Sequence, residues 1–127
     1  MPSEMHYVAT GKRFKVHAEA YEVRLIKADE RTDGAFAEVL YEGERTLVSP
    51  ILDESEAYGH RAYSMISFVD DLSLDLVGLL ASVSNALAER GVPIFVISSY
   101  RTDHLLVLQE HLGKTLAALE SLGMTRQ

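Results

Sequence analysis

The sequence contains no cysteine. Thiol catalysis, disulfide bonds and cysteine-ligated zinc are therefore excluded. Basic residues are scarce, because 12 lysine and arginine residues stand against 19 acidic ones, for a net charge of −7. Nucleic acids and anionic membranes need a basic face, so neither is expected as a partner. The one basic cluster, Lys12, Arg13 and Lys15, is interpreted as a solvated strand edge.

Long apolar runs are also missing, since none approaches the roughly 20 residues of a membrane span. Residues 1–10 lack the apolar core of a signal peptide, so a cytoplasmic location is expected. The length of 127 residues, with 47% hydrophobic side chains, is typical of one compact domain or of two small intertwined ones.

The first half of the chain has the pattern of β-strands. Apolar and polar side chains alternate over residues 14–18 and again over 21–25, as in half-buried strands. Residues 36–41 and 46–51 flank Glu42-Gly43-Glu44-Arg45, whose glycine suits a hairpin loop. This half is therefore predicted to be rich in strands.

The second half predicts strands and helices in the order β-α-β-β-α. The strands are residues 63–69, 93–100 and 104–109, and the apolar run 93–100 is typical of a central strand. Apolar residues at helical spacing predict helices from Val77 to Gly91, with Ser73 or Asp75 as the cap, and over residues 112–122.

One further strand would complete a ferredoxin-like βαββαβ unit, an α+β fold with an antiparallel sheet and both helices on one face. Because an open sheet edge must be covered, we expect a strand from the first half, or from another subunit, to complete the sheet.

Motifs of catalysis are absent, including phosphate loops and nucleophile elbows. None of the five histidines forms the i, i+4 pair of a helical metal site, and His104 is interpreted as a satisfied turn residue. We therefore expect no enzyme, no catalytic residue, no metal and no cofactor.

Two segments are candidates for a ligand site. Gly78 opens a helix whose N-terminus suits a carboxylate, although a glycine here also permits close packing on the sheet. Residues 98–103 bring hydroxyls, an aromatic ring and a carboxylate to a strand end, where Asp103 can pair with a cation, although Thr102-Asp103 also makes a good turn. The two segments suit the two ends of a zwitterion.

At these residues the chain resembles the ACT domain family. The segments 76–81 (LVGLLA) and 87–94 (LAERGVPI) look like the ACT helix and the strand after it. The run 97–107 (ISSYRTDHLLV) resembles the subgroup of the CASTOR-type arginine sensor and short bacterial tandem ACT proteins.

This resemblance implies a degenerate, strand-rich ACT-like unit at residues 1–58, partly intertwined with an ACT domain at 59–127. It also implies a homodimeric sensor that binds an amino acid and acts on a regulatory protein partner. Carried over by position, the ligand contacts are Gly78, Leu79, Ser99, Tyr100 and Asp103. Val77, which precedes Gly78 at the helix start, is predicted as a sixth contact. The alternative is an interaction and dimerisation module that has lost its ligand.

Overall fold

The computed structural model describes residues 8–27, 29, 33–51, 61–69 and 77–127. The described strands and helices, in chain order, are β1 (Arg13–Ile26), β2 (Ala37–Tyr41), β3 (Glu44–Pro50), β4 (Tyr63–Phe68), α2 (Leu79–Glu89), β5 (Phe95–Ser98), β6 (Asp103–Leu108), the 3-10 helix η2 (Gln109–His111), α3 (Leu112–Ser121) and β7 (Thr125–Arg126). The strands form one sheet in the order β2-β3-β1-β4-β6-β5, and β7 pairs with β1.

The long strand β1 joins the two halves of the protein. Its amino-terminal end pairs with β4, and its carboxy-terminal end pairs with β3. The register against β4 shifts between Val16 and Ala20, so the two predicted strands 14–18 and 21–25 are one strand with an irregularity. The expectation that a strand from the first half completes the sheet of the second half is therefore confirmed.

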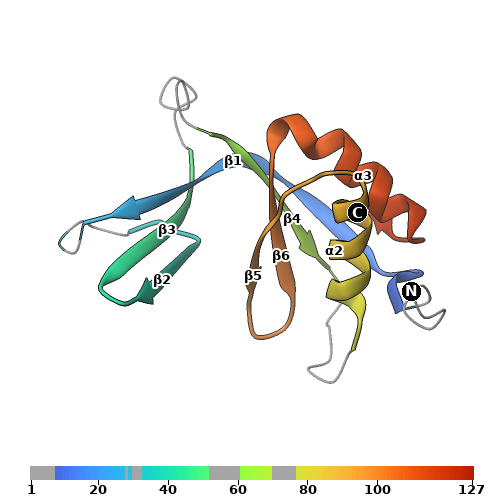
Figure 1. The fold of residues 1–127 in the computed structure, drawn as a ribbon, viewed down its shortest axis with the longest axis horizontal. Helices are drawn as coiled ribbons and strands as arrows, with labels where there is room; N and C mark the ends of the chain where they lie inside the picture. The colour runs from blue at the N-terminus through green and yellow to red at the C-terminus, as the bar shows by residue number, and fades with distance from the viewer. Residues whose placement is uncertain (1–7, 28, 30–32, 52–60, 70–76) are drawn as a thin grey trace.

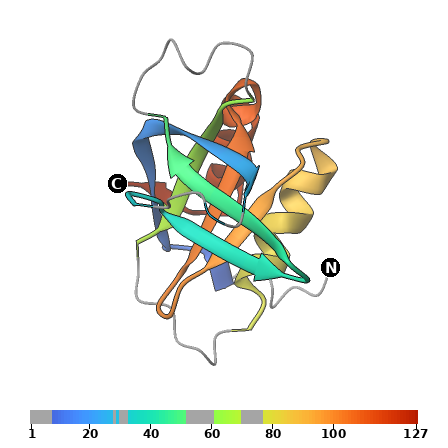
Figure 2. The ribbon, with the colours of Figure 1, turned by 90° about the vertical axis from the view of Figure 1, so that its left-hand side faces the viewer.

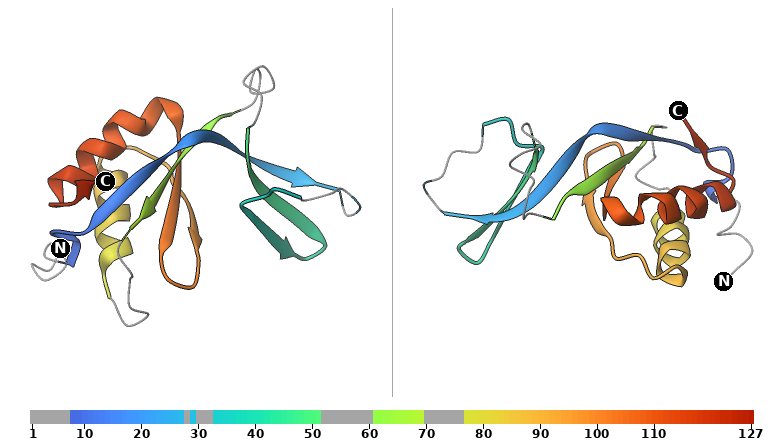
Figure 3. Two further views of the ribbon diagram at one scale, coloured as in Figure 1. Left: turned by 180° about the vertical axis from the view of Figure 1, so that it is seen from behind. Right: turned by 90° about the horizontal axis from the view of Figure 1, so that it is seen from above.

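Strands β1, β4, β6 and β5 form an antiparallel sheet with α2 and α3 on the same face (Figure 1). Figure 3 shows both helices along this face from two further directions. Because β1 already lies beside β4, the short β7 instead runs parallel to the outer side of β1. The predicted α+β fold, with an antiparallel sheet and helices on one face, is confirmed.

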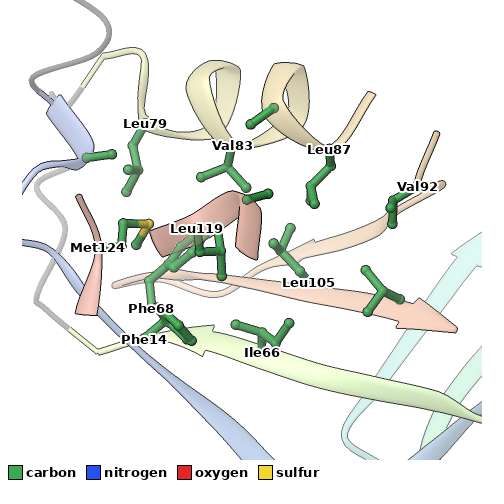
Figure 4. Packing of buried hydrophobic residues seen from close by; sticks show 14 residues of the cluster. Phe14, Ile66, Phe68, Leu79, Val83, Leu87, Val92, Leu105, Leu119 and Met124 are labelled. Carbon is green, nitrogen blue, oxygen red and sulfur yellow. The ribbon is translucent and has the colours of Figure 1, made fainter. Parts of the chain in front are cut away.

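The main core lies between this sheet and the helices (Figure 4). Alternate strand residues point into it: Phe14 pairs with Phe68, and Val16 pairs with Ile66, which in turn pairs with Leu105. Residues one position along each strand point to the helix-free face of the sheet. This alternation decides which polar side chains lie on each face.

The β2–β3 hairpin projects from the rest of the protein (Figure 1). In Figure 2 the hairpin faces the viewer. Its turn is Glu42-Gly43, and both residues have positive φ, 47° and 79°, as a two-residue type I′ turn requires. A second apolar cluster lies on the helix-free face of the sheet. It contains Tyr21 of β1, Val48 of β3, Met65 of β4 and Leu106 of β6.

Two details of the prediction are wrong. Residues 93–100 do not form a central strand, because β5 lies at the end of the strand order. Its run is apolar because Val96 packs against the main core while Phe95 and Ile97 pack against the second cluster. The N-cap of α2 is Gly78, and not Ser73 or Asp75, which lie outside the described residues.

Candidate ligand-binding site

The first candidate region is the start of α2. Gly78 is the N-cap with φ 95°, a left-handed conformation that favours glycine. The first helical hydrogen bond runs from the Ser82 N–H to the Gly78 carbonyl, and no side chain among the described residues caps this end. The N–H groups of the first turn are therefore free of helical partners. They give this end of α2 a partial positive charge.

The second candidate region is the turn between β5 and β6. Asp103 pairs across the strands with Ser98, and the Ser98 hydroxyl donates a 2.6 Å hydrogen bond to the Asp103 carboxylate. Asp103 is two residues before Leu105, which is buried beneath the helices, so Asp103 lies on the helix-bearing face. The start of α2 and this turn lie at the same end of the sheet (Figures 1 and 2).

The other predicted contacts are placed differently. Leu79 is 3% exposed, with its side chain in the core, so it offers a ligand only its backbone. Val77 and Tyr100 are 83% and 78% exposed. Ser99 bonds to His104, which belongs to the helix-free face. The structure thus brings Gly78 and Asp103 to the same face and end of the sheet, and it directs Ser99 to the opposite face.

A row of polar side chains crosses the helix-free face. Ser67 of β4 is the direct partner of Lys15 in β1 and of His104 in β6. His17 lies two residues beyond Lys15, and its Nε2 is 2.7 Å from Ser67 Oγ. Two imidazole rings therefore meet at one buried hydroxyl, because Ser67 Oγ is also 2.6 Å from His104 Nδ1.

One arrangement of protons satisfies this network with both histidines neutral. Ser99 donates its hydroxyl hydrogen to the Thr102 carbonyl at 3.1 Å, so His104 Nε2 must donate to Ser99 at 3.0 Å. His104 Nδ1 is then an acceptor for Ser67, and His17 Nε2 donates to Ser67. His17 Nδ1 accepts from the Tyr21 hydroxyl at 3.3 Å.

The surroundings of the two rings favour these neutral forms. Burial is the main cause that lowers the pKa of His17, and Lys15 lowers it further, against the opposing charge of Glu19. Burial also lowers the pKa of His104, with His17 and Lys15 acting in the same direction and Asp103 opposing them. The ring of Phe36 covers His104 edge-on, with 5.0 Å between the ring centroids.

A cavity of about 310 Å³ opens beside this network. Its lining residues are Lys15, His17, Ser67, Phe68, Val69, Thr102, His104 and Gln127. None of the six predicted contact residues lines this cavity. The polar row is therefore a feature of its own, separate from the site predicted at the start of α2.

Sequence reasoning missed this network because its members are far apart in the chain. The interpretation of His104 as a satisfied residue agrees with its two hydrogen bonds to serines. The available signal was Ser67, a polar residue inside the apolar strand 63–69. Its two partners could be identified only from the strand register.

No group of three or more histidine, aspartate or glutamate residues that could hold a metal occurs in the described part of the chain. None of the described helices is long and apolar enough to cross a membrane.

Comparison with known families supports the fold. Residues 59–121 match the family model described as ACT domain. The sheet with two helices on one face accordingly has the ACT domain fold. No curated protein matches the sequence.

Solved structures of other proteins share this fold. A protein of Agobacterium tumefaciens is 25% identical, with 92% of each chain covered and a TM-score of 0.74. A Vibrio cholerae protein, described as of unknown function and a possible transport protein, is 24% identical, covers 91% of this chain and 94% of its own, and has a TM-score of 0.74. The ligand-free regulatory subunit of aspartate kinase from Thermus thermophilus is 13% identical, with 90% and 98% covered and a TM-score of 0.62.

Proposed function

We propose that this protein is a regulatory module without enzymatic activity that binds an amino acid. The match of residues 59–121 to the ACT domain model supports a regulatory, ligand-binding role. The likeness to an aspartate kinase regulatory subunit, at 13% identity, concerns the fold, and the kinase activity is not carried over. The narrower resemblance to CASTOR-type sensors remains a prediction from residues 97–107.

The observation that carries the proposal is the position of Asp103 relative to α2. Asp103 lies on the helix-bearing face, at the end of the sheet where the first turn of α2 begins. A free amino acid carries a carboxylate and an ammonium group. The helix N–H groups suit the carboxylate, and the Asp103 carboxylate suits the ammonium group or a cationic side chain.

In this proposal the other five predicted residues shape the site around the ligand. Gly78 has no Cβ, so a ligand carboxylate can approach the helix end closely. The backbone N–H of Leu79 faces that carboxylate, and the exposed side chains of Val77 and Tyr100 cover the stem of the ligand. Ser99 holds the turn through its bond to the Thr102 carbonyl.

We also propose that the protein is a homodimer and that its first 58 residues form a degenerate ACT-like unit intertwined with the domain at 59–127. The shared strand β1, which pairs with β3 and with β4, supports the intertwined arrangement. A regulatory protein partner in the cytoplasm would read the ligand-bound state.

The alternative function is a dimerisation module that has lost its ligand. The outer strand β2 favours it, because Leu40 and Tyr41 are 72% and 67% exposed on a strand that pairs on one side alone among the described residues. Exposed apolar residues on an unpaired sheet edge favour association.

A thermal-shift screen of the twenty amino acids separates the two functions. A ligand at 100 times its dissociation constant adds about 2.7 kcal/mol of stability, which raises the melting temperature measurably. The sensor hypothesis expects one amino acid, or one chemical group of them, to do so. Uniform melting temperatures across the screen would favour the dimerisation module.

A further inference from the structure

We propose that the cavity beside Ser67 is a second binding site. It binds the oxyanion of a small molecule, either a carboxylate or a phosphate group, and the protein takes up one proton when the molecule binds. The cavity lies on the helix-free face, so this site does not depend on the one proposed at the start of α2. Its basis is the chemistry of the residues that line it.

Lys15 supplies the fixed positive charge of the site. It lines the cavity and acts electrostatically on both histidines. No hydrogen bond or ion pair of the Lys15 side chain occurs among the described residues. A cation beside two neutral imidazole rings in a cavity of about 310 Å³ suits an anion better than a neutral or cationic ligand.

The hydrogen bonds among Ser67, His104 and Ser99 explain why anion binding is coupled to the uptake of a proton. With both histidines neutral, the single hydroxyl hydrogen of Ser67 is committed to His104 Nδ1. When His104 takes up a proton at Nδ1, both imidazole rings donate to Ser67 Oγ, which has two lone pairs to accept them. The hydroxyl hydrogen of Ser67 then needs a new acceptor, and an oxyanion in the cavity provides it.

The other charges near the two rings do not replace the ligand. Glu19 on β1 acts on His17, and Asp103 on β6 acts on His104, and both favour the protonated rings. Their effect is smaller than that of burial, so the rings stay neutral at neutral pH. An anion in the cavity adds a second negative charge and shifts this balance toward the imidazolium form.

Calorimetric titration of the full chain with sulfate and with acetate tests this site. Neither probe takes up a proton near neutral pH, and the two distinguish a phosphate-like ligand from a carboxylate. Titrations in two buffers of different protonation enthalpy measure the protons bound. We expect an uptake of up to one proton. We also expect the affinity to increase as the pH falls, by up to about tenfold for each unit by which the bound anion raises the pKa of His104.

Three variants make the test specific. Lys15→Met is expected to weaken binding by about 10- to 100-fold, because it removes one charge-assisted hydrogen bond. Lys114→Met, on the exposed surface of α3 across the sheet, is the matched control and is expected to bind normally. His104→Asn leaves Ser67 an acceptor but cannot take up the proton, so its binding is expected to lose the pH dependence.

The outcomes decide the proposal. Binding of either probe with proton uptake that disappears in His104→Asn supports it, and the probe that binds more tightly identifies the natural group. No binding of either probe at millimolar concentration would overturn it. So would binding without proton uptake, or equal losses in Lys15→Met and Lys114→Met.

Discussion

Phe14 and Phe68 are direct cross-strand partners, one from β1 and one from β4. Both lie in the core beneath the two helices, with exposures of 0% and 2% (Figure 4). This pair shows that the ACT sheet includes a strand that precedes residue 59, where the family match begins. The amino-terminal part of β1 therefore contributes to the core beneath α2 and α3.

The contribution of that strand can be measured at Phe14. Replacing Phe14 by Ala in a closed core is expected to lower the free energy of unfolding by about 3–5 kcal/mol. Leu25→Ala, in the same strand but 69% exposed, is the control and is expected to change it by less than about 1 kcal/mol. Urea denaturation gives both values. Equal losses in the two variants would contradict the shared core.

Removal of the strand tests the same relationship more severely. A fragment of residues 58–127 lacks β1, so the β4 edge is open and β7 has no partner. We expect this fragment to be insoluble or to show no cooperative unfolding. A soluble fragment with a sharp melting transition would mean that the second unit folds independently.

Much of the fold could be predicted from the sequence, because its local signals agree with the final structure. The turn at Gly43 and the helix end at Gly91 require positive φ, and both glycines are present at those places. The role of β5 could not be predicted, because an apolar run looks the same in a central strand and in an edge strand covered on both faces. Here Val96 and Ile97 pack against two different clusters.

The candidate site was only partly predictable. The sequence indicated Gly78 and Asp103, which the structure places at one end and on one face of the sheet. It did not show that Ser99 is directed to the other face, since this follows from its hydrogen bond to His104. The network around Ser67 depends on the register of three strands, which no local pattern encodes.

The histidine network predicts how stability depends on pH. The native pKa of His104 is lowered, chiefly by burial, from the value of 6.5 that applies in the unfolded chain. The unfolded state therefore binds more protons below that pH, and the stability present above it is lost as the pH falls through the native pKa. His104→Asn is expected to show a shallower decline. Denaturation curves from pH 7.5 to 5 measure this, and unchanged steepness would count against the network.

The edge of β2 predicts self-association. Val39, Leu40 and Tyr41 are exposed apolar residues on this outer strand, and we expect two copies to meet there. Light scattering on the purified protein is expected to give the mass of a dimer, and Leu40→Lys the mass of a monomer. Ala117→Lys, on the exposed surface of α3, is the control and is expected to remain a dimer. A monomeric wild type at micromolar concentration would refute the prediction.

The most direct test of ligand binding at the start of α2 is calorimetry on Asp103→Asn with the amino acid that the thermal-shift screen identifies. Asparagine keeps the size of Asp103 and can still accept from Ser98, but it removes the charge that would pair with the ligand. The account predicts a 10- to 100-fold weaker affinity, since a charge-assisted hydrogen bond contributes about 1.5–3 kcal/mol. It also predicts an unchanged melting temperature without ligand. Asp29→Asn, in the connection between β1 and β2, is the control and should bind normally. Wild-type affinity in Asp103→Asn would contradict the proposed site.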